Sequence, residues 1–190
     1  MAEELAAGNA LTLGSWAGAS LEWQVMEVLE DRVLLLCKEC PEARALHSVR
    51  EEVGWKDSGL RKWLNETFFN EAFTDAEKSE ILSVRCETPD SVRYKTPGCG
   101  PTEDRVFLLS YDEAVRLFEK SVDRQVQPTS HAAEGGAYQN AAGFCWWWLR
   151  APGVQPDYGA TVSIDGWVDG YGHLVSDAYV GVRPAVFIRK

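Results

Sequence analysis

The residues of this sequence that could support catalysis are few, and they lie far apart along the chain. Cys37 and Cys40 form a lone CxxC pair, a spacing used both for zinc binding and for disulfide exchange. A structural zinc site needs two more ligands, and the sequence contains no second CxxC and no HxxxH. A redox CxxC starts a helix, whereas this pair follows the strand-like run VLLL at 33–36. Together with the odd total of five cysteines, this predicts reduced, unpaired thiols at the end of a strand and no metal.

The three histidines add no motif of known chemistry. His47 and Glu51 are four residues apart and would share one face of a helix, but one histidine and one carboxylate are too few ligands for a metal. His131 and His173 have no partner that the sequence reveals. There is no GxSxG, no phosphate-binding glycine loop and no HExxH, while a Ser-His-Asp triad, which assembles only in space, stays open. The residues alone therefore favour neither an enzyme nor a bound cofactor.

The overall composition is that of one globular domain spanning residues 1–190, with 45% hydrophobic and 25% charged residues. The net charge of -10 repels phosphate, so we expect no nucleic-acid partner and no anionic membrane. No apolar run approaches the roughly 18 residues that a membrane helix requires, and we expect no membrane insertion. The first residues lack the pattern of a secretory signal. This predicts a cytoplasmic protein, or one that is exported without an N-terminal signal and displayed on a cell surface or phage particle.

The first half of the chain predicts strands followed by helices. Residues 21–37 read as two strands around a Glu-Asp turn. Apolar residues recur at helical spacing over 57–73, with Ser58 as N-cap and a bend at 70–73. A capping box from Thr74 to Glu77 starts a second helix. Residues 86–104 are rich in Pro, Gly and Asp and predict a long loop.

The second half predicts one more helix and then an antiparallel, loop-rich region. A short strand at 106–109 leads into the capping box Ser110–Glu113 and a helix over 114–120, and residues 121–143 read as a flexible loop. Beyond Gly153, alternating residues predict a hairpin turning at Asp165-Gly166, with a second turn at 170–173. Strands, helices and then an antiparallel half indicate an α+β fold.

Several ordered motifs resemble an uncharacterised domain family common in gut Gram-positive bacteria. They are GSW (14–16), LEWQVMEVLEDRVLLL (21–36), WKDSGLRKWLN (55–65), FFNEAFTDAEKSEI (68–81), VFLLSYDEA (106–114), WWLRAPG (147–153) and GVRPAVFI (181–188). The family looks like a branch of the C-type-lectin fold, of the formylglycine-generating-enzyme subtype. The resemblance implies helices packed on a small antiparallel sheet with a loop-rich C-terminal lobe, in one domain.

The same family resembles the variable proteins of diversity-generating retroelements, which rewrite adenine positions between a WWLR-like and a GVRPA-like motif. The resemblance implies a receptor- or adhesin-like module with a variable ligand-binding region at 154–180, whose partner is an unknown protein or glycan. Its polar and aromatic residues are types that paratopes favour. The candidate ligand-binding residues are Gln155, Asp157, Tyr158, Thr161, Ser163, Trp167, Asp169, Tyr171, His173, Ser176, Asp177 and Tyr179, interleaved with core-facing Ala160, Val162, Ile164, Gly166, Val168 and Val175.

Three other interpretations stay open. The polar residues of 154–180 are also ordinary turn residues of a β-meander. A formylglycine-generating oxidoreductase, or an inactive relative, is implied by the same resemblance, but that chemistry needs a copper-binding cysteine pair near the C-terminus, where this chain has only Cys145. Related iron enzymes need a histidine triad that this sequence does not resemble. The third alternative is a structural domain of a phage or cell-surface assembly.

The three tryptophans of WWWLR at 146–150 could belong to the hydrophobic core or could form a ligand-binding surface. In a strand, Trp146 and Trp148 face one side and Trp147 the other, and three bare rings would expose more apolar area than a monomer tolerates. We therefore expect all three tryptophans to be structural core. Arg150 and Arg183 are expected to be structural anchors, each with a buried partner or a cluster of carbonyls.

Overall fold

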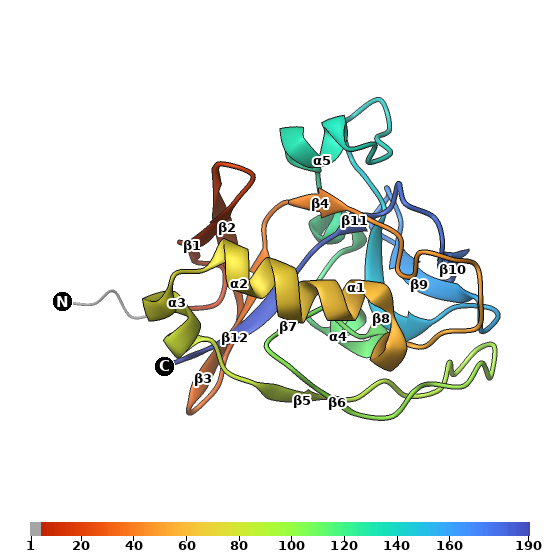
Figure 1. Cartoon of the computed structure of the whole chain (residues 1–190), viewed down its shortest axis with the longest axis horizontal. Helices are drawn as coiled ribbons and strands as arrows, with labels where there is room; N and C mark the ends of the chain where they lie inside the picture. Colours follow the sequence, from red (N-terminus) through yellow and green to blue (C-terminus); the bar gives the residue numbers. More distant parts are fainter. Residues whose placement is uncertain (1–4) are drawn as a thin grey trace.

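The computed structural model describes residues 5–190, and its main framework is two five-stranded sheets (Figure 1). The first sheet has the order β1 (Ala10–Trp16), β2 (Ala19–Val28), β3 (Arg32–Cys37), β12 (Ala185–Arg189) and β7 (Val106–Phe107). The second has the order β10 (Val168–Leu174), β9 (Tyr158–Val162), β8 (Trp147–Pro152), β11 (Gly181–Val182) and β4 (Glu42–Ala43). A separate pair joins β5 (Val84–Cys86) to β6 (Thr102–Asp104). With a few short helices, the fold is α+β, as predicted.

The C-terminal strand connects the two sheets. The predicted strands around the Glu-Asp turn are confirmed as β2 and β3, which pair antiparallel. β12 then adds antiparallel to the other edge of β3, so that Ala185 lies opposite Leu36 and Ile188 opposite Val33. Residues 33–37 are all buried, because β3 has a strand on each side and is covered on both faces. The chain passes from β11 in the second sheet to β12 in the first across two residues, 183 and 184.

One continuous helical segment crosses in front of the sheets in Figure 1. It consists of α1 (Gly59–Trp63), a π-helical turn (Leu64–Phe68) and α2 (Phe69–Ala72). The predicted N-cap is confirmed, since the Ser58 side chain accepts a hydrogen bond from the backbone N–H of Arg61. The predicted bend over 70–73 begins later than expected: the helix continues to Ala72, and the extended residues are Phe73 and Thr74, the N-cap of the next helix. α3 (Asp75–Glu80) follows with the predicted capping box.

The remaining helices are short and lie in the middle of the chain. α4 (Tyr111–Arg116) begins at the predicted capping box but ends four residues before the predicted end. The stretch predicted as a flexible loop, 121–143, contains a 3-10 turn (Ser121–Arg124) and α5 (Ser130–Glu134), and another 3-10 turn covers Trp55–Asp57. The predicted loop 86–104 is shorter than expected, because its two ends pair as β5 and β6.

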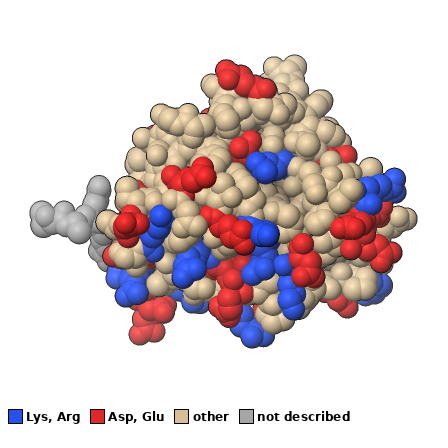
Figure 2. Space-filling model, in the orientation of Figure 1, with Lys and Arg blue, Asp and Glu red and all other residues tan. Residues whose placement is uncertain are grey.

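Residues of both sheets and of the helical segment belong to one continuous hydrophobic cluster. Its largest fully buried side chains include Trp23, Trp147, Trp148, Phe68 and Phe107. On the surface, charged side chains gather over the lower half of the face in Figure 2, while the upper part, around β4 and α5, carries few charges. None of the helices within residues 5–190 is long and apolar enough to cross a membrane.

Candidate functional site

The predicted ligand-binding region folds mainly as the hairpin of β9 and β10, at the edge of the second sheet. The predicted turn at Asp165-Gly166 is confirmed, with backbone hydrogen bonds that link Ser163 to Gly166 and Trp167. The predicted second turn at 170–173 is wrong, because these residues form a bulge inside β10. Gly172 makes the bulge possible: its φ is +73°, and a Cβ there would lie 1.9 Å from the carbonyl oxygen of Gly159.

The bulge sends neighbouring side chains of β10 to different surroundings. The ring of Tyr171 packs edge-on against Tyr158, with centroids 5.7 Å apart, and against Tyr94 at 6.4 Å. The ring of His173 instead contacts Trp146 at 4.8 Å and Trp148 at 6.4 Å. The hairpin therefore presents two aromatic clusters, one around Tyr171 and one around His173.

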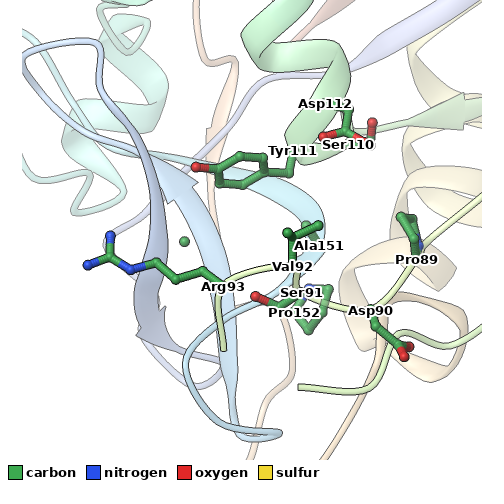
Figure 3. Close-up of a pocket in the computed structure, with 11 residues that line it drawn as sticks. Pro89, Asp90, Ser91, Val92, Arg93, Ser110, Tyr111, Asp112, Ala151 and Pro152 are labelled. Carbon is green, nitrogen blue, oxygen red and sulfur yellow. The ribbon is translucent and has the colours of Figure 1, made fainter. Parts of the chain in front are cut away.

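A pocket of about 330 Å³ lies beside the Tyr171 cluster. Its walls come from loop 89–93, from residues 110–112 at the start of α4, from Ala151 and Pro152 at the end of β8, and from Gly170 of β10. Figure 3 shows Tyr111 extending across one side of the pocket with Val92, Ala151 and Pro152 facing it. The Asp90 carboxylate and the Arg93 guanidinium lie at opposite sides. The interior is mainly apolar, and the charged groups stand at the rim.

Gly170 borders the pocket next to two tyrosine rings. A Cβ at Gly170 would lie 3.4 Å from Cε2 of Tyr111 and 3.7 Å from Cε2 of Tyr94. The glycine thus separates two tyrosine rings that come from α4 and from the loop after β5. Tyr111 is 40% exposed and Tyr171 is 52% exposed, so both rings are accessible to a ligand.

An ion pair between buried Arg150 (4% exposed) and partly exposed Glu113 (28%) holds two walls of the pocket together. Arg150 donates to both carboxylate oxygens of Glu113, at 2.7 and 2.8 Å, and Glu113 also accepts from the backbone N–H of Ser110 at 2.8 Å. Burial by itself would raise the pKa of Glu113, but the hydrogen bonds and positive charge of Arg150 hold it below its ordinary value. Ser110 and the residue after Arg150 both border the pocket, so the pair fixes the start of α4 against β8.

The His173 cluster is more closely packed. Tyr138 stacks on Trp146 with centroids 4.4 Å apart, and His173 covers the indole at 4.8 Å. Nδ1 of His173 lies 3.2 Å from the hydroxyl of Tyr179, which donates to Asp177 at 3.1 Å. Burial lowers the pKa of His173, against the attraction of Asp177. These contacts attach the loop before β8 to β10.

The candidate ligand-binding residues differ in their exposure. Those exposed are Gln155, Trp167, Tyr171 and Tyr179, and those partly exposed are Asp157, Tyr158, Ser163, Asp169, His173, Ser176 and Asp177. The expectation that Thr161 is displayed is wrong: its side chain is fully buried, and its hydroxyl has no hydrogen-bond partner within residues 5–190. β9 lies between β8 and β10 and is covered on both faces, so its residues do not alternate between core and solvent.

All three candidate carboxylates already have partners in the chain, Asp177 through the hydroxyl of Tyr179 described above. Asp157 accepts a hydrogen bond from Nε of Arg50 at 2.8 Å, which ties the start of the hairpin to loop 47–53. Asp169 accepts from the backbone N–H of Tyr171 at 2.9 Å and so stabilises the bulge. These groups contribute to the shape of the surface as well as to its charge.

The expected anchors are buried as predicted, with one exception among the tryptophans. Arg183 is 3% exposed and donates to the carbonyl oxygens of Cys37 and Arg124, and its guanidinium lies 5.0 Å from the ring of Trp147. Trp147 and Trp148 are fully buried. The expectation that Trp146 is core is wrong: β8 begins one residue later, and Trp146 is partly exposed within the His173 cluster.

Sequence reasoning missed the pocket residues outside 154–180. Val92 and Tyr111 line the pocket, and Tyr94 packs against Tyr171 beside it. They come from segments that lie roughly 60 to 80 positions before β10, and no periodic pattern relates them to it. The available signal was weak: an apolar valine and a tyrosine inside a polar, glycine- and proline-rich loop. Val92 is 81% exposed, which its residue type does not predict.

The thiols that lie near one another are buried, and His47 and His131 each lie next to a carboxylate. All five cysteines are free, as predicted, and only Cys99 is not buried. Burial raises the pKa of the Cys37 thiol to about 12, and burial together with the neighbouring Cys145 raises that of Cys40. Nε2 of His47 lies 2.7 Å from a carboxylate oxygen of Glu51, although residues 47–51 do not form a helix. Nε2 of His131 lies 3.4 Å from a carboxylate oxygen of Glu42. Within residues 5–190 no three His, Cys, Asp or Glu side chains are grouped as metal ligands.

The fold and this surface define an α+β protein with a candidate binding face at the edge of its second sheet. A family model described as a domain of unknown function, DUF6273, matches residues 30–190, and the chain belongs to that family. No curated protein and no solved structure matches the chain.

Proposed function

We propose that this protein is a ligand-binding module that presents the β9–β10 hairpin and the adjoining pocket to a protein or glycan. The observation that carries the proposal is the exposed tyrosine cluster beside an apolar pocket. Tyr171 and Tyr111 offer large, rigid rings to solvent directly next to a mainly apolar cavity. Tyrosine supplies contact area at low cost in conformational entropy, which is why binding surfaces favour it.

The arrangement of the sheets supports this proposal. β12 pairs with β3 in the first sheet, whereas β9 and β10 form the far edge of the second (Figure 1). Only the β8 side of the hairpin is hydrogen-bonded to the rest of its sheet. Side chains exposed on β10 can therefore change without altering the strand pairs that build the first sheet.

The finer proposal is a C-type-lectin-like variable protein of a diversity-generating retroelement. It is supported by the interleaving of exposed Trp167, Tyr171 and Tyr179 with buried Val162 and Val175. It predicts a reverse-transcriptase gene beside this gene, with a near-copy of the codons for 147–188 that differs at adenines. If neither is found in the neighbourhood, the retroelement part of the proposal is wrong, while ligand binding is tested separately.

The binding proposal is tested with two defined sets of probes, random peptides displayed on phage and an array of glycans. We expect the full chain to retain specific members of at least one set, and Tyr171→Ala to reduce retention about tenfold or more. Tyr171 is 52% exposed, so the substitution leaves the fold intact. The control is Glu71→Ala, an exposed position on α2, which should retain the same probes. Specific probes that Tyr171→Ala retains as well as the wild type would contradict the proposed surface.

A further inference from the structure

We propose that the pocket beside Gly170 binds an apolar side chain of a protein partner, and that this side chain is followed or preceded in the partner by a lysine or arginine. This inference rests on the proposed ligand-binding function and narrows it. Of the two ligand classes named there, it selects a protein, and it assigns a binding role to residues 89–93 and 110–112, outside the hairpin.

The size and lining of the pocket favour a single apolar side chain. Its volume of about 330 Å³ lies at the small end of the range of about 300 to 1,000 Å³ for ligand pockets. The two serine hydroxyls that border it already serve the backbone: Oγ of Ser91 accepts from the N–H of Tyr94, and Oγ of Ser110 accepts from the N–H of Glu113. A sugar ring would bring several hydroxyls into a site with few free partners, and each unpaired hydroxyl costs free energy.

The surface around the pocket indicates a partner larger than the pocket itself. Val92 is 81% exposed, Tyr171 is 52% exposed, and Val115, one helical turn after Tyr111, is 47% exposed. A small ligand confined to the pocket would leave these side chains in water. A protein segment that inserts one side chain would cover them with its flanking residues, which is the usual arrangement of an anchor residue in an interface.

The charges at the rim favour a cation next to the inserted side chain. The Asp112 carboxylate accepts no hydrogen bond and joins no ion pair with any of residues 5–190, and Asp90 uses one carboxylate oxygen to accept from the N–H of Gly98. Among the residues that line the pocket, the positive charge is that of Arg93, which lies over the ring of Tyr94 at 5.2 Å, on the side opposite Asp90 (Figure 3). The carboxylate side thus complements a lysine or arginine.

The test is an NMR titration of the ¹⁵N-labelled full chain with three small probes: N-acetyl-Trp-Lys-amide, N-acetyl-Trp-Glu-amide and methyl α-glucoside. We expect the Trp-Lys probe to give saturable shifts at the amides of Val92, Tyr111 and Gly170. At low salt its Kd should be smaller than that of the Trp-Glu probe by about threefold or more. The combined substitution Asp90→Asn and Asp112→Asn should remove this preference, whereas Glu134→Gln, an exposed carboxylate on α5, should keep it.

Two variants separate pocket binding from loss of the fold. Gly170→Val places a side chain between Tyr111 and Tyr94 and should abolish the shifts, with the amide spectrum showing that the chain is folded. Val92→Ser changes a side chain that is 81% exposed and should weaken binding without affecting stability. Unchanged binding in both variants would overturn the assignment of the pocket.

The other outcomes are equally decisive. Shifts by methyl α-glucoside in place of the peptide probes would overturn this inference but leave the proposed ligand-binding function standing, with a glycan as ligand. Equal Kd values for the Trp-Lys and Trp-Glu probes, or no shifts with any probe, would also overturn it. The proposed function fails by a different result, namely retained phage or glycan probes that do not depend on Tyr171.

Discussion

The ion pair between Glu113 and Arg150 gives the sharpest prediction for stability. The Arg150 side chain is 4% exposed, and both of its bonds to Glu113 are shorter than 3 Å. Glu113→Gln removes the negative charge with little change in volume and leaves a buried guanidinium without its counter-charge. Breaking a buried pair in this way costs about 3 to 5 kcal/mol. We expect a loss near the lower end, because the amide oxygen can still accept one hydrogen bond.

The assay is equilibrium unfolding in urea at neutral pH, with the free energy of unfolding compared between variants. A matched control is available on the surface, where Arg116 forms a similar two-bonded pair with Glu27 and is 56% exposed. Glu27→Gln should cost no more than about 1 kcal/mol, because solvent screens this pair. If Glu113→Gln and Glu27→Gln changed the free energy of unfolding by the same small amount, the reasoning about the buried pair would be refuted.

The same pair predicts a dependence on pH. The pKa of Glu113 in the folded protein lies below its ordinary value of 4.5, so ionised Glu113 stabilises the fold at any pH above that value. This contribution is lost as the pH falls from 4.5 through the folded pKa. The free energy of unfolding should therefore decrease more steeply below pH 4.5 in the wild type than in Glu113→Gln. Parallel curves for the two proteins would contradict the assigned pKa direction.

Four further substitutions test the scaffold and the His173 cluster. Arg183→Ala should lower the free energy of unfolding by about 2 to 4 kcal/mol, because it leaves buried carbonyls without their donor, and an equally stable variant in urea would contradict this role. Trp148→Ala should cost about 3 to 5 kcal/mol and Trp146→Ala clearly less, since only the former is fully buried; equal losses in the same assay would refute the distinction. Burial lowers the pKa of His173 below 6.5, so the fold should lose stability as the pH falls below 6.5 through the folded pKa, and His173→Gln should reduce that dependence in urea titrations at pH 7 and 5.

Local signals in the sequence predicted the local structure well. The caps at Ser58, Thr74 and Ser110 are confirmed because each depends on residues within one helical turn. The strands β2 and β3 and the turn at 165–166 are likewise short-range features. The buried state of Arg150 and Arg183 could be predicted because an arginine inside an apolar motif needs an internal partner.

The incorrect predictions concern features that depend on neighbours distant in sequence. The glycines at 170 and 172 looked like a turn, but the pairing with β9 continues at His173, so residues 170–172 form a bulge within β10. Thr161 looked exposed by alternation, yet it is fully buried, because β9 is covered on both of its faces. The pocket could not be predicted at all, because Tyr94 and Tyr111 reach β10 only after the whole chain has folded.

Hydrogen exchange of the full chain tests the central claim most directly, measured with and without a peptide or glycan retained in the binding selection. We predict that the ligand slows exchange in three segments together, residues 89–94, 110–112 and 167–173, while exchange in β1, β2 and α3 is unchanged. Protection confined to β1, β2 or α3, with no change in the three segments, would contradict the account of the β9–β10 hairpin and its pocket as the binding surface.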